Sequence, residues 1–169
     1  DGYTILMGSI TTNAVNPSIY KKLPYNHLRD FAAISMVGTV PNALVVHPSV
    51  PAKTMKDFLA YAKAHPGKIN FGSAGVGSAP HLSMELIKSM AGINMVHVPT
   101  TGTAPAVQAV VQGAVQVHIN NVQSLLPLVQ DGQLRGLGVA ESIRLKNAPN
   151  IPTIAETIPG FDMAPWTAV

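Results

Sequence analysis

Apolar residues recur at helical spacing in several segments, and short apolar runs separate these segments from one another. The first helical segment begins after Thr54, which forms a capping box with Asp57 in the place of the usual Glu. It ends at His65-Pro66-Gly67, because proline and a terminal glycine stop helices. Its expected apolar face consists of Met55, Phe58, Leu59 and Ala62. The pattern predicts an amphipathic helix.

A second helix is predicted directly after a glycine-rich stretch. Ser78 is its expected N-cap, Pro80 stands in the first turn, where its missing N–H costs nothing, and Gly92 closes it. Its expected apolar face consists of Leu82, Leu86, Ile87 and Met90.

The spacing of apolar residues and the terminal residues predict two further helices. Thr103 caps the third helix, which ends at Gly113 and turns Val107, Val110 and Val111 inward. The fourth helix is short, and it runs from Ser124 to Gly132.

Short apolar runs between the helices predict strands. The expected strands are Tyr3–Met7, Phe31–Val37, Asn42–His47, Lys68–Phe71, Asn94–Val98 and Leu134–Val139, with a last one at Trp166. In 115–120, Val115, Val117 and Ile119 alternate with Gln116, His118 and Asn120, which is typical of a half-buried strand. We expect a helical turn in 153–157 and a core position for Trp166. Because strands and helices alternate, the sequence predicts an α/β fold with a mostly parallel sheet and flanking helices.

Three strand-to-helix turns carry the residues that point to a binding site. They are Gly72–Ser78, Pro99–Thr103 and Asn120–Ser124, and all are rich in glycine, hydroxyl or amide residues and free of acids. In a parallel sheet such turns open on one edge, where ligands collect. The first N–H groups of a helix have no intrahelical partner and lie at the positive end of the helix dipole. The turns therefore favour an anion-binding site over ordinary tight-turn chemistry.

The spacing of the chemical groups argues against most enzymes. The glycines read G-x-x-G-x-G without a following lysine, which is neither the dinucleotide motif nor a P-loop. Ser73 with His81 as its base is an alternative, but the G-x-S-x-G elbow is absent. The histidines lack metal-ligand spacing, the chain has no cysteine, and its eight acids are dispersed. We expect no metal and no cofactor.

The composition argues against two classes of partner, nucleic acids and the membrane interior. The net charge is only +3 and, apart from Lys21-Lys22, the basic residues are scattered, so we expect no nucleic-acid binding. Apolar residues reach 47%, but no stretch approaches the roughly 18 apolar residues that a membrane span needs.

A set of motifs is distributed over nearly the whole chain. They are Asp1–Ser9, Asn16–Tyr20, Leu23–Tyr25, Arg29–Phe31, His47–Ser49, Pro66–Ser78, His81-Leu82, Pro152–Glu156, Gly160-Phe161 and Trp166. This combination resembles the tripartite tricarboxylate transporter substrate-binding proteins, the Bug family of periplasmic solute receptors.

The resemblance implies a fold like that of type II periplasmic binding proteins, in which two lobes close on a small carboxylate. The receptor then delivers the carboxylate to membrane transporter subunits. It further implies that 1–37 form part of the first lobe and the hinge, 38–140 the complete α/β second lobe, and 141–169 a truncated return segment. The chain would be an interior fragment, since the family's N-terminal glycine-rich loop and its C-terminal segment have no counterpart here.

The resemblance also assigns site residues. In the second lobe they are Ser73, Ala74, Gly75, Gly77, His81, Thr101, Gly102, Asn120 and Asn121, and in the first lobe Ser9 and Thr11. The loop that is commonly Pro-Tyr-Lys-Gly in the family reads Pro-Thr-Thr-Gly from Pro99, and a loop that is often Asp-Asn reads Asn120-Asn121. The missing Tyr and Lys leave the identity of the carboxylate open.

With the opposite lobe incomplete, we expect the Gly72–Ser78 turn to stand open to solvent and this chain to bind weakly or not at all. Two alternatives to a receptor follow from the residues. One is an enzyme that uses Ser73 and His81 for acyl or phosphoryl transfer, and the other is a structural or interaction unit that self-associates through its cut strand edges.

Overall fold

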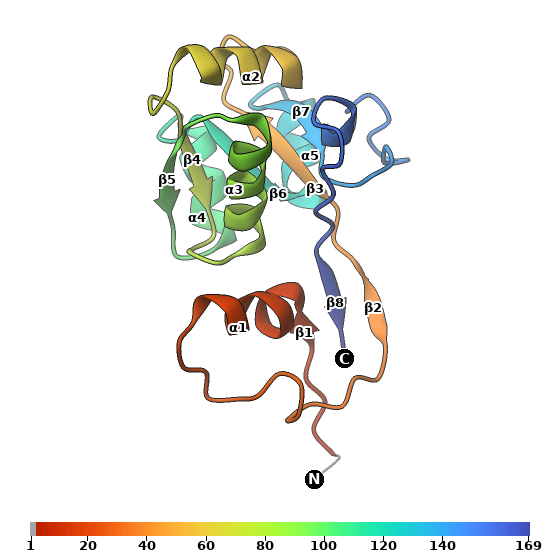
Figure 1. Ribbon diagram of the computed structural model, residues 1–169. Helices are drawn as coiled ribbons and strands as arrows, with labels where there is room; N and C mark the ends of the chain where they lie inside the picture. Colours follow the sequence, from red (N-terminus) through yellow and green to blue (C-terminus); the bar gives the residue numbers. More distant parts are fainter. Residues whose placement is uncertain (1–2) are drawn as a thin grey trace.

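The computed structural model describes residues 3–169, and its strands form two separate sheets (Figure 1). Asp1 and Gly2, which open the first family motif, lie outside the described residues. The small sheet has the antiparallel order β1-β8-β2, made of β1 (Gly8–Ser9), β8 (Trp166–Ala168) and β2 (Met36–Thr39). A π-helical turn, η1 (Thr11–Val15), and the short helix α1 (Asn16–Ile19) follow β1.

Two expected strands of the small sheet are misplaced. The strand predicted at Tyr3–Met7 is wrong, because pairing with β8 is confined to Gly8–Ser9. The strand predicted at Phe31–Val37 begins later, at Met36, where the chain comes into register with Ala168 of β8.

The large sheet has the order β5-β4-β6-β3-β7. Its strands are β3 (Asn42–Val46), β4 (Asn70–Ser73), β5 (Val96–Pro99), β6 (Val117–Asn121) and β7 (Arg135–Val139). β4 is parallel to β5 and β6, whereas β3 is antiparallel to β6 and β7. The expected mostly parallel sheet is confirmed, with β3 as its one reversed strand.

Helices cover both faces of the large sheet (Figure 1). They are α2 (Met55–Ala64), α3 (Ala79–Ala91), α4 (Thr103–Val111) and α5 (Val122–Gln130). Leu44 and Val46 of β3 pack with α2 and α3, whereas Ala43 and Val45 pack with α4 and α5. This alternation explains why β3 is buried on both faces.

The helix caps agree with the sequence at two helices and differ at the other two. The capping box of Thr54 and Asp57 and the N-cap Ser78 are confirmed. α4 is capped by Gly102, so that Thr103 is its first residue. α5 begins two residues before Ser124, because the side chain of Asn121 accepts the Ser124 N–H and serves as the N-cap.

Two burial predictions need correction. α3 buries Pro80, Ser83, Met84 and Ile87. The buried face of this helix is therefore rotated away from Leu82 and Met90, which were predicted to lie on it. Strand β6 is not half-buried, since Val117 to Asn120 are all buried. Met84 and Ile87 of α3 belong to the core cluster beneath that helix. Helices pack on both faces of the sheet, so the polar positions of β6 are covered as well.

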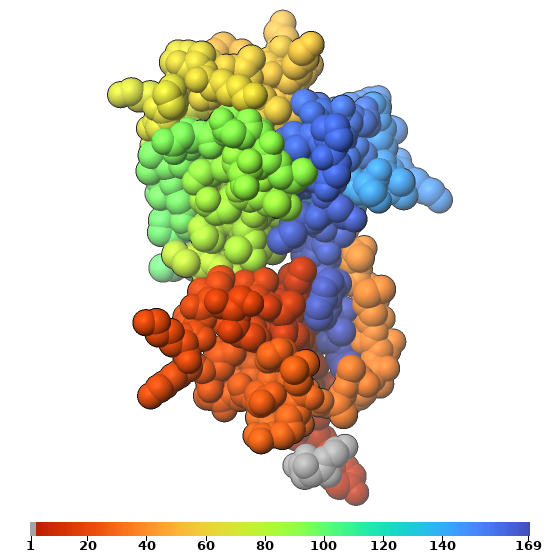
Figure 2. Space-filling view, viewed as in Figure 1, coloured from red at the N-terminus to blue at the C-terminus, as the bar shows by residue number. Residues whose placement is uncertain are grey.

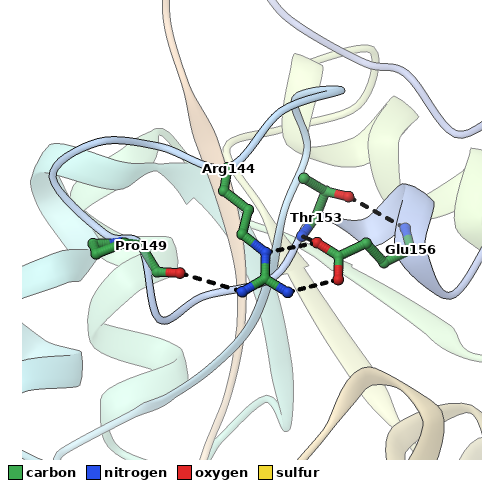
Figure 3. A network of polar contacts seen from close by, with 4 residues as sticks. All are labelled: Arg144, Pro149, Thr153 and Glu156. Atoms are coloured by element: carbon green, nitrogen blue, oxygen red, sulfur yellow. Dashed lines mark hydrogen bonds and ion pairs between the residues drawn. The ribbon is translucent and has the colours of Figure 1, made fainter.

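The segment between the sheets holds a polar network (Figure 3). The expected turn in 153–157 is the 3-10 helix η2 (Ile154–Glu156), and Thr153 and Glu156 form a capping box there. Arg144 donates to both carboxylate oxygens of Glu156, with N···O distances of 2.8 and 2.7 Å. These bonds fix the loop after β7 before the chain returns to the small sheet.

Candidate functional site

The three sequence-predicted turns lie at one edge of the large sheet. They follow the ends of β4, β5 and β6, which are neighbouring parallel strands. Thr100 joins the first two turns, because its N–H and its hydroxyl both donate to the carbonyl of Ser73, at 3.0 and 2.9 Å. The shared edge that the sequence predicts is thereby confirmed.

The Gly72–Ser78 turn, which we call the glycine turn, is held together by its own side chains. Ser73 is fully buried, with 0% of its surface exposed, and its Oγ accepts the Gly75 N–H at 3.1 Å. The Ser78 hydroxyl donates to the Gly75 carbonyl at 2.7 Å, and the Gly77 N–H donates to His81 Nδ1 at 3.2 Å. The side chains of Ser73 and His81 therefore shape the turn from within.

A histidine that the sequence reasoning missed supports this turn. His97 Nε2 lies 2.6 Å from Ser73 Oγ, and the His97 ring stacks between Phe71 and His81, with ring centroids 4.8 and 4.1 Å away. Burial lowers the pKa of His97, as do the nearby His81 and Lys88, whereas Glu85 acts to raise it. The proposed pairing of Ser73 with His81 is not formed, because Ser73 contacts His97 instead.

A chain of hydrogen bonds connects the glycine turn's strand to α5. The Gly72 carbonyl can only accept, so His118 Nδ1 donates to it at 2.9 Å, and His118 Nε2 then accepts from Asn120 Nδ2 at 3.1 Å. Asn120 Oδ1 accepts the Asn121 N–H at 2.8 Å. Both ends of the Asn120 amide are therefore used inside the protein.

Gly72 makes room for this chain. A Cβ at Gly72 would lie 3.1 Å from Val115 Cγ2 and 3.6 Å from His118 Nδ1. A larger residue there would press on the imidazole, so glycine at this position has a packing role as well as a place in the turn.

A pocket of about 200 Å³ lies between the two sheets, and we call it the cleft pocket. The large-sheet side contributes Asn42, Asn120, Asn121, Ala79 and Pro80, and the small-sheet side contributes Ser9, Ile10, Thr11, Pro165, Trp166 and Thr167, with Val40 between them. No Asp, Glu, Lys or Arg is among these described residues. The pocket thus offers amides, hydroxyls and the start of α3 to a ligand.

The cleft pocket brings together part of the predicted site. Four predicted residues line it, namely Ser9, Thr11, Asn120 and Asn121. The other predicted residues lie in the neighbouring turns and do not line it, namely Ser73, Ala74, Gly75, Gly77, His81, Thr101 and Gly102. Sequence reasoning missed Asn42 and placed Trp166 in the core, whereas Trp166 is half-buried at the pocket.

The glycine turn is only partly open to solvent: Val76 is 61% exposed, whereas Gly72, Ser73 and Gly77 are buried. Gly77 is buried, and a Cβ on it would lie 3.1 Å from Ile19 Cδ1 of α1. Figure 2 shows the N-terminal segment packed against the region where α3 begins. Because Gly77 also has a φ of +80°, only glycine suits both its backbone and this contact.

A second pocket of about 190 Å³ adjoins the cleft pocket. Thr39, Val40 and Pro41 line it from the β2–β3 connection, Asn121, Val122 and Gln123 from the start of α5, and Asn147 from the loop after β7. Val40 and Asn121 line both pockets.

Within residues 3–169, no three His, Asp or Glu side chains gather as a metal site. No helix in the same range has the length and apolar character required to cross a membrane.

Sequence comparisons agree with the resemblance drawn from the motifs. The family model "Tripartite tricarboxylate transporter family receptor" matches residues 1–169. Protein BugT of Bordetella pertussis is 36% identical over 171 residues, which cover 100% of this chain and 52% of BugT. A UPF0065 protein from the tcbD-tcbE intergenic region of Pseudomonas sp. strain P51 is also 36% identical, with 51% of its length covered. The chain thus spans about half the length of the curated relatives it matches.

Solved structures give the same assignment. R. palustris Rpa4515 with adipate matches with a TM-score of 0.92 and 34% identity, over 99% of this chain and 56% of that protein. The periplasmic binding protein BugD matches with a TM-score of 0.90 and 27% identity, over 99% and 56%. MatC from Rhodopseudomonas palustris with bound malate matches with a TM-score of 0.86 and 28% identity, over 96% and 55%.

These descriptions are of receptors and binding proteins, which decides against the enzyme built on Ser73 and His81. The matched family model covers the whole sequence, and the structural matches confirm a fold like that of periplasmic binding proteins. The chain therefore belongs to the tripartite tricarboxylate transporter receptor family.

Proposed function

We propose that this protein is a periplasmic receptor that captures a small carboxylate in the cleft pocket and delivers it to the membrane subunits of a tripartite tricarboxylate transporter. The observation that carries the proposal is the lining of the pocket, where uncharged amide and hydroxyl residues from both sheets stand among apolar residues beside the start of α3. Adipate and malate, the ligands named for the matched structures, are small dicarboxylates.

Neutral donors are sufficient to hold a carboxylate. A hydrogen bond to a charged group contributes roughly 1.5–3 kcal/mol, and a helix N-terminus adds roughly 0.3–1 kcal/mol. Three or four such bonds give on the order of 5–12 kcal/mol before the cost of association is subtracted. Holding the anion in this way involves no proton transfer and no nucleophile, which fits a receptor that must release its solute unchanged.

The two sheets suggest how the pocket opens and closes. We propose that residues 38–140, which contain β3 to β7, form the second lobe, and that 1–37 and 141–169 contribute to the first lobe. Since each side supplies several lining residues, a ligand in the pocket would contact both lobes at once. Contact with both lobes is what favours a closed form over an open one.

Titration of the 15N-labelled chain with adipate and with malate tests the proposal. We expect weak binding, with a Kd of about 1 mM, because the chain spans about half of its relatives. The amide signals that move should belong to pocket residues such as Ser9, Thr11 and Asn121.

Thr11→Val, which removes one hydroxyl from the pocket, should weaken binding severalfold. Thr103→Val is the matched control, because Thr103 is exposed at the start of α4 and does not line the pocket. Signals that stay unchanged with both ligands, or that move only outside the pocket, would contradict the proposal.

A further inference from the structure

We infer that Asn42 contacts the bound solute directly through its side chain, and that Glu141 is the positioning residue that holds Asn42 in place. This inference rests on the function proposed above, since it names a residue of the same pocket.

The position of Asn42 follows from the direction of β3. Because β3 is antiparallel to β6 and β7, its first residue lies at the edge where the parallel strands end. Asn42 pairs there with Asn121 and, with 4% of its surface exposed, lines the cleft pocket. A strand start thus reaches the same edge as the strand-to-helix turns.

The main chain of Asn42 is fixed on both sides. Its N–H donates to Glu141 Oε1 at 3.0 Å, and its carbonyl accepts the Ala140 N–H at 2.8 Å. The bond to Glu141 therefore joins two residues that are 99 positions apart, one just after β7 and the other at the start of β3. The direction of the Asn42 side chain depends on this peptide, so Glu141 sets it.

The side chain of Asn42 differs from the other two amides of the pocket. Asn120 uses both ends of its amide internally, and Asn121 Oδ1 accepts the Ser124 N–H. Among the described residues, the carboxamide of Asn42 has no hydrogen-bond partner in the chain. The amide atoms of Asn42 are not among the described polar atoms that are fully buried without a partner, so they remain accessible from the cleft pocket. Their donor and acceptor are therefore free to bond a solute or water.

The chemistry of the site fits a carboxylate ligand. Asn42 Nδ2 can donate to a carboxylate oxygen, and its Oδ1 can accept from a hydroxyl of the solute or from water. Glu141 is 9% exposed and its Oε2 has no partner within the described chain, so burial disfavours its charged form. Burial raises the pKa of Glu141, and the charge of Asp162 acts in the same direction. A neutral amide at position 42 therefore admits an anion that an aspartate would repel.

Adipate titration of the 15N-labelled chain tests the contact with Asn42 directly, through the NMR signals of its side-chain NH2 group. Its side-chain NH2 pair is the one that disappears from the spectrum of Asn42→Leu, and it should shift as adipate is added. Asn42→Leu should bind adipate about ten- to a hundredfold more weakly, as expected for the loss of one hydrogen bond to a charged group.

Two further pairs of variants separate direct contact from structural damage. Asn42→Asp should lose adipate binding at neutral pH, whereas Asn94→Asp adds the same charge to an exposed residue before β5 and should not. Glu141→Gln keeps an acceptor for the Asn42 N–H and should bind as the wild type does. Glu141→Leu removes that acceptor, so it should weaken binding and change the position of the Asn42 NH2 pair.

Each outcome decides a separate point. If the wild type binds adipate but its Asn42 NH2 pair does not move, Asn42 is not a contact and the inference is overturned while the proposed function stands. If Asn42→Leu binds normally, the same conclusion holds. If Glu141→Leu binds normally, the positioning role is overturned. A wild-type chain that binds no adipate overturns the inference, and malate binding then decides the proposed function. The wild-type NH2 pair can also be assigned by triple-resonance NMR of the 13C,15N-labelled chain, so its signal settles the question even where a variant fails to fold.

Discussion

His118 is a single buried side chain that links the glycine turn's strand to the start of α5. Its two nitrogens have different roles, because Nδ1 donates to Gly72 and Nε2 accepts from Asn120. Only the neutral imidazole can do both. Burial lowers the pKa of His118, and the bond to the Gly72 carbonyl only partly opposes this.

Acidification should therefore destabilise the protein. In the unfolded chain His118 takes up a proton near its ordinary pKa of 6.5, whereas in the folded protein it does so only at lower pH. The stability is thus fully present above pH 6.5 and falls as the pH drops below it. His118→Gln should lower the free energy of unfolding by about 1–3 kcal/mol at pH 8 and flatten its decline toward pH 5. Urea unfolding at a series of pH values measures both, and an equally steep decline in the variant would contradict the prediction.

Residue types at the site were predictable from the sequence, but their roles were not. Glycine spacing identified the turn, yet whether Ser73 faces a ligand or its own turn depends on His97, which lies 24 residues away. Asn42 carried no local signal at all, since it is an ordinary residue at the start of an apolar strand. Its importance arises from long-range packing.

At the scale of elements, β3 explains most of the difference between sequence and structure. Its apolar pattern predicted a strand, and the boundaries 42–47 were nearly right. Direction is not encoded in such a pattern, because a buried strand reads the same both ways. The turns that follow parallel strands could therefore be expected at one edge of the sheet. The reversed strand that brings Asn42 to that edge could not be expected.

The loop after β7 depends on the Arg144–Glu156 pair (Figure 3). Arg144 and the Thr153 backbone N–H lower the pKa of Glu156 to about 2. Because the folded pKa is below the ordinary 4.5, the pair stabilises the fold above pH 4.5 and loses this effect as the pH falls toward 2.

Arg144→Gln should raise the pKa of Glu156 toward its ordinary value, with Thr153 retaining part of the shift. Titration of the Glu156 carboxyl carbon by NMR measures this directly. Arg29→Gln is the control, since it removes an exposed arginine that pairs with Asp30 instead. A Glu156 titration that is identical in the wild type and Arg144→Gln would show that the arginine is not responsible.

At the scale of the whole molecule, the small sheet is much less covered than the large one. β2 lies at its edge, and Met36 and Val37 are 64% and 58% exposed. An exposed apolar edge strand is a template for pairing with another chain.

We expect this chain to self-associate as its concentration rises, through the β2 edge. Val37→Lys should reduce the association, because a charged side chain on an edge strand disfavours pairing. Val76→Lys is the matched control, since Val76 is 61% exposed in the glycine turn and outside the small sheet. Sedimentation equilibrium over a range of concentrations measures the apparent mass, and a constant monomer mass for the wild type would refute the prediction.

Val40 and Asn121 give the two pockets a common partition. Because both pockets share these two residues, a shift of either side chain alters the lining of both. If the proposed function holds, a solute that moves either residue from within the cleft pocket would also change the space beside the start of α5.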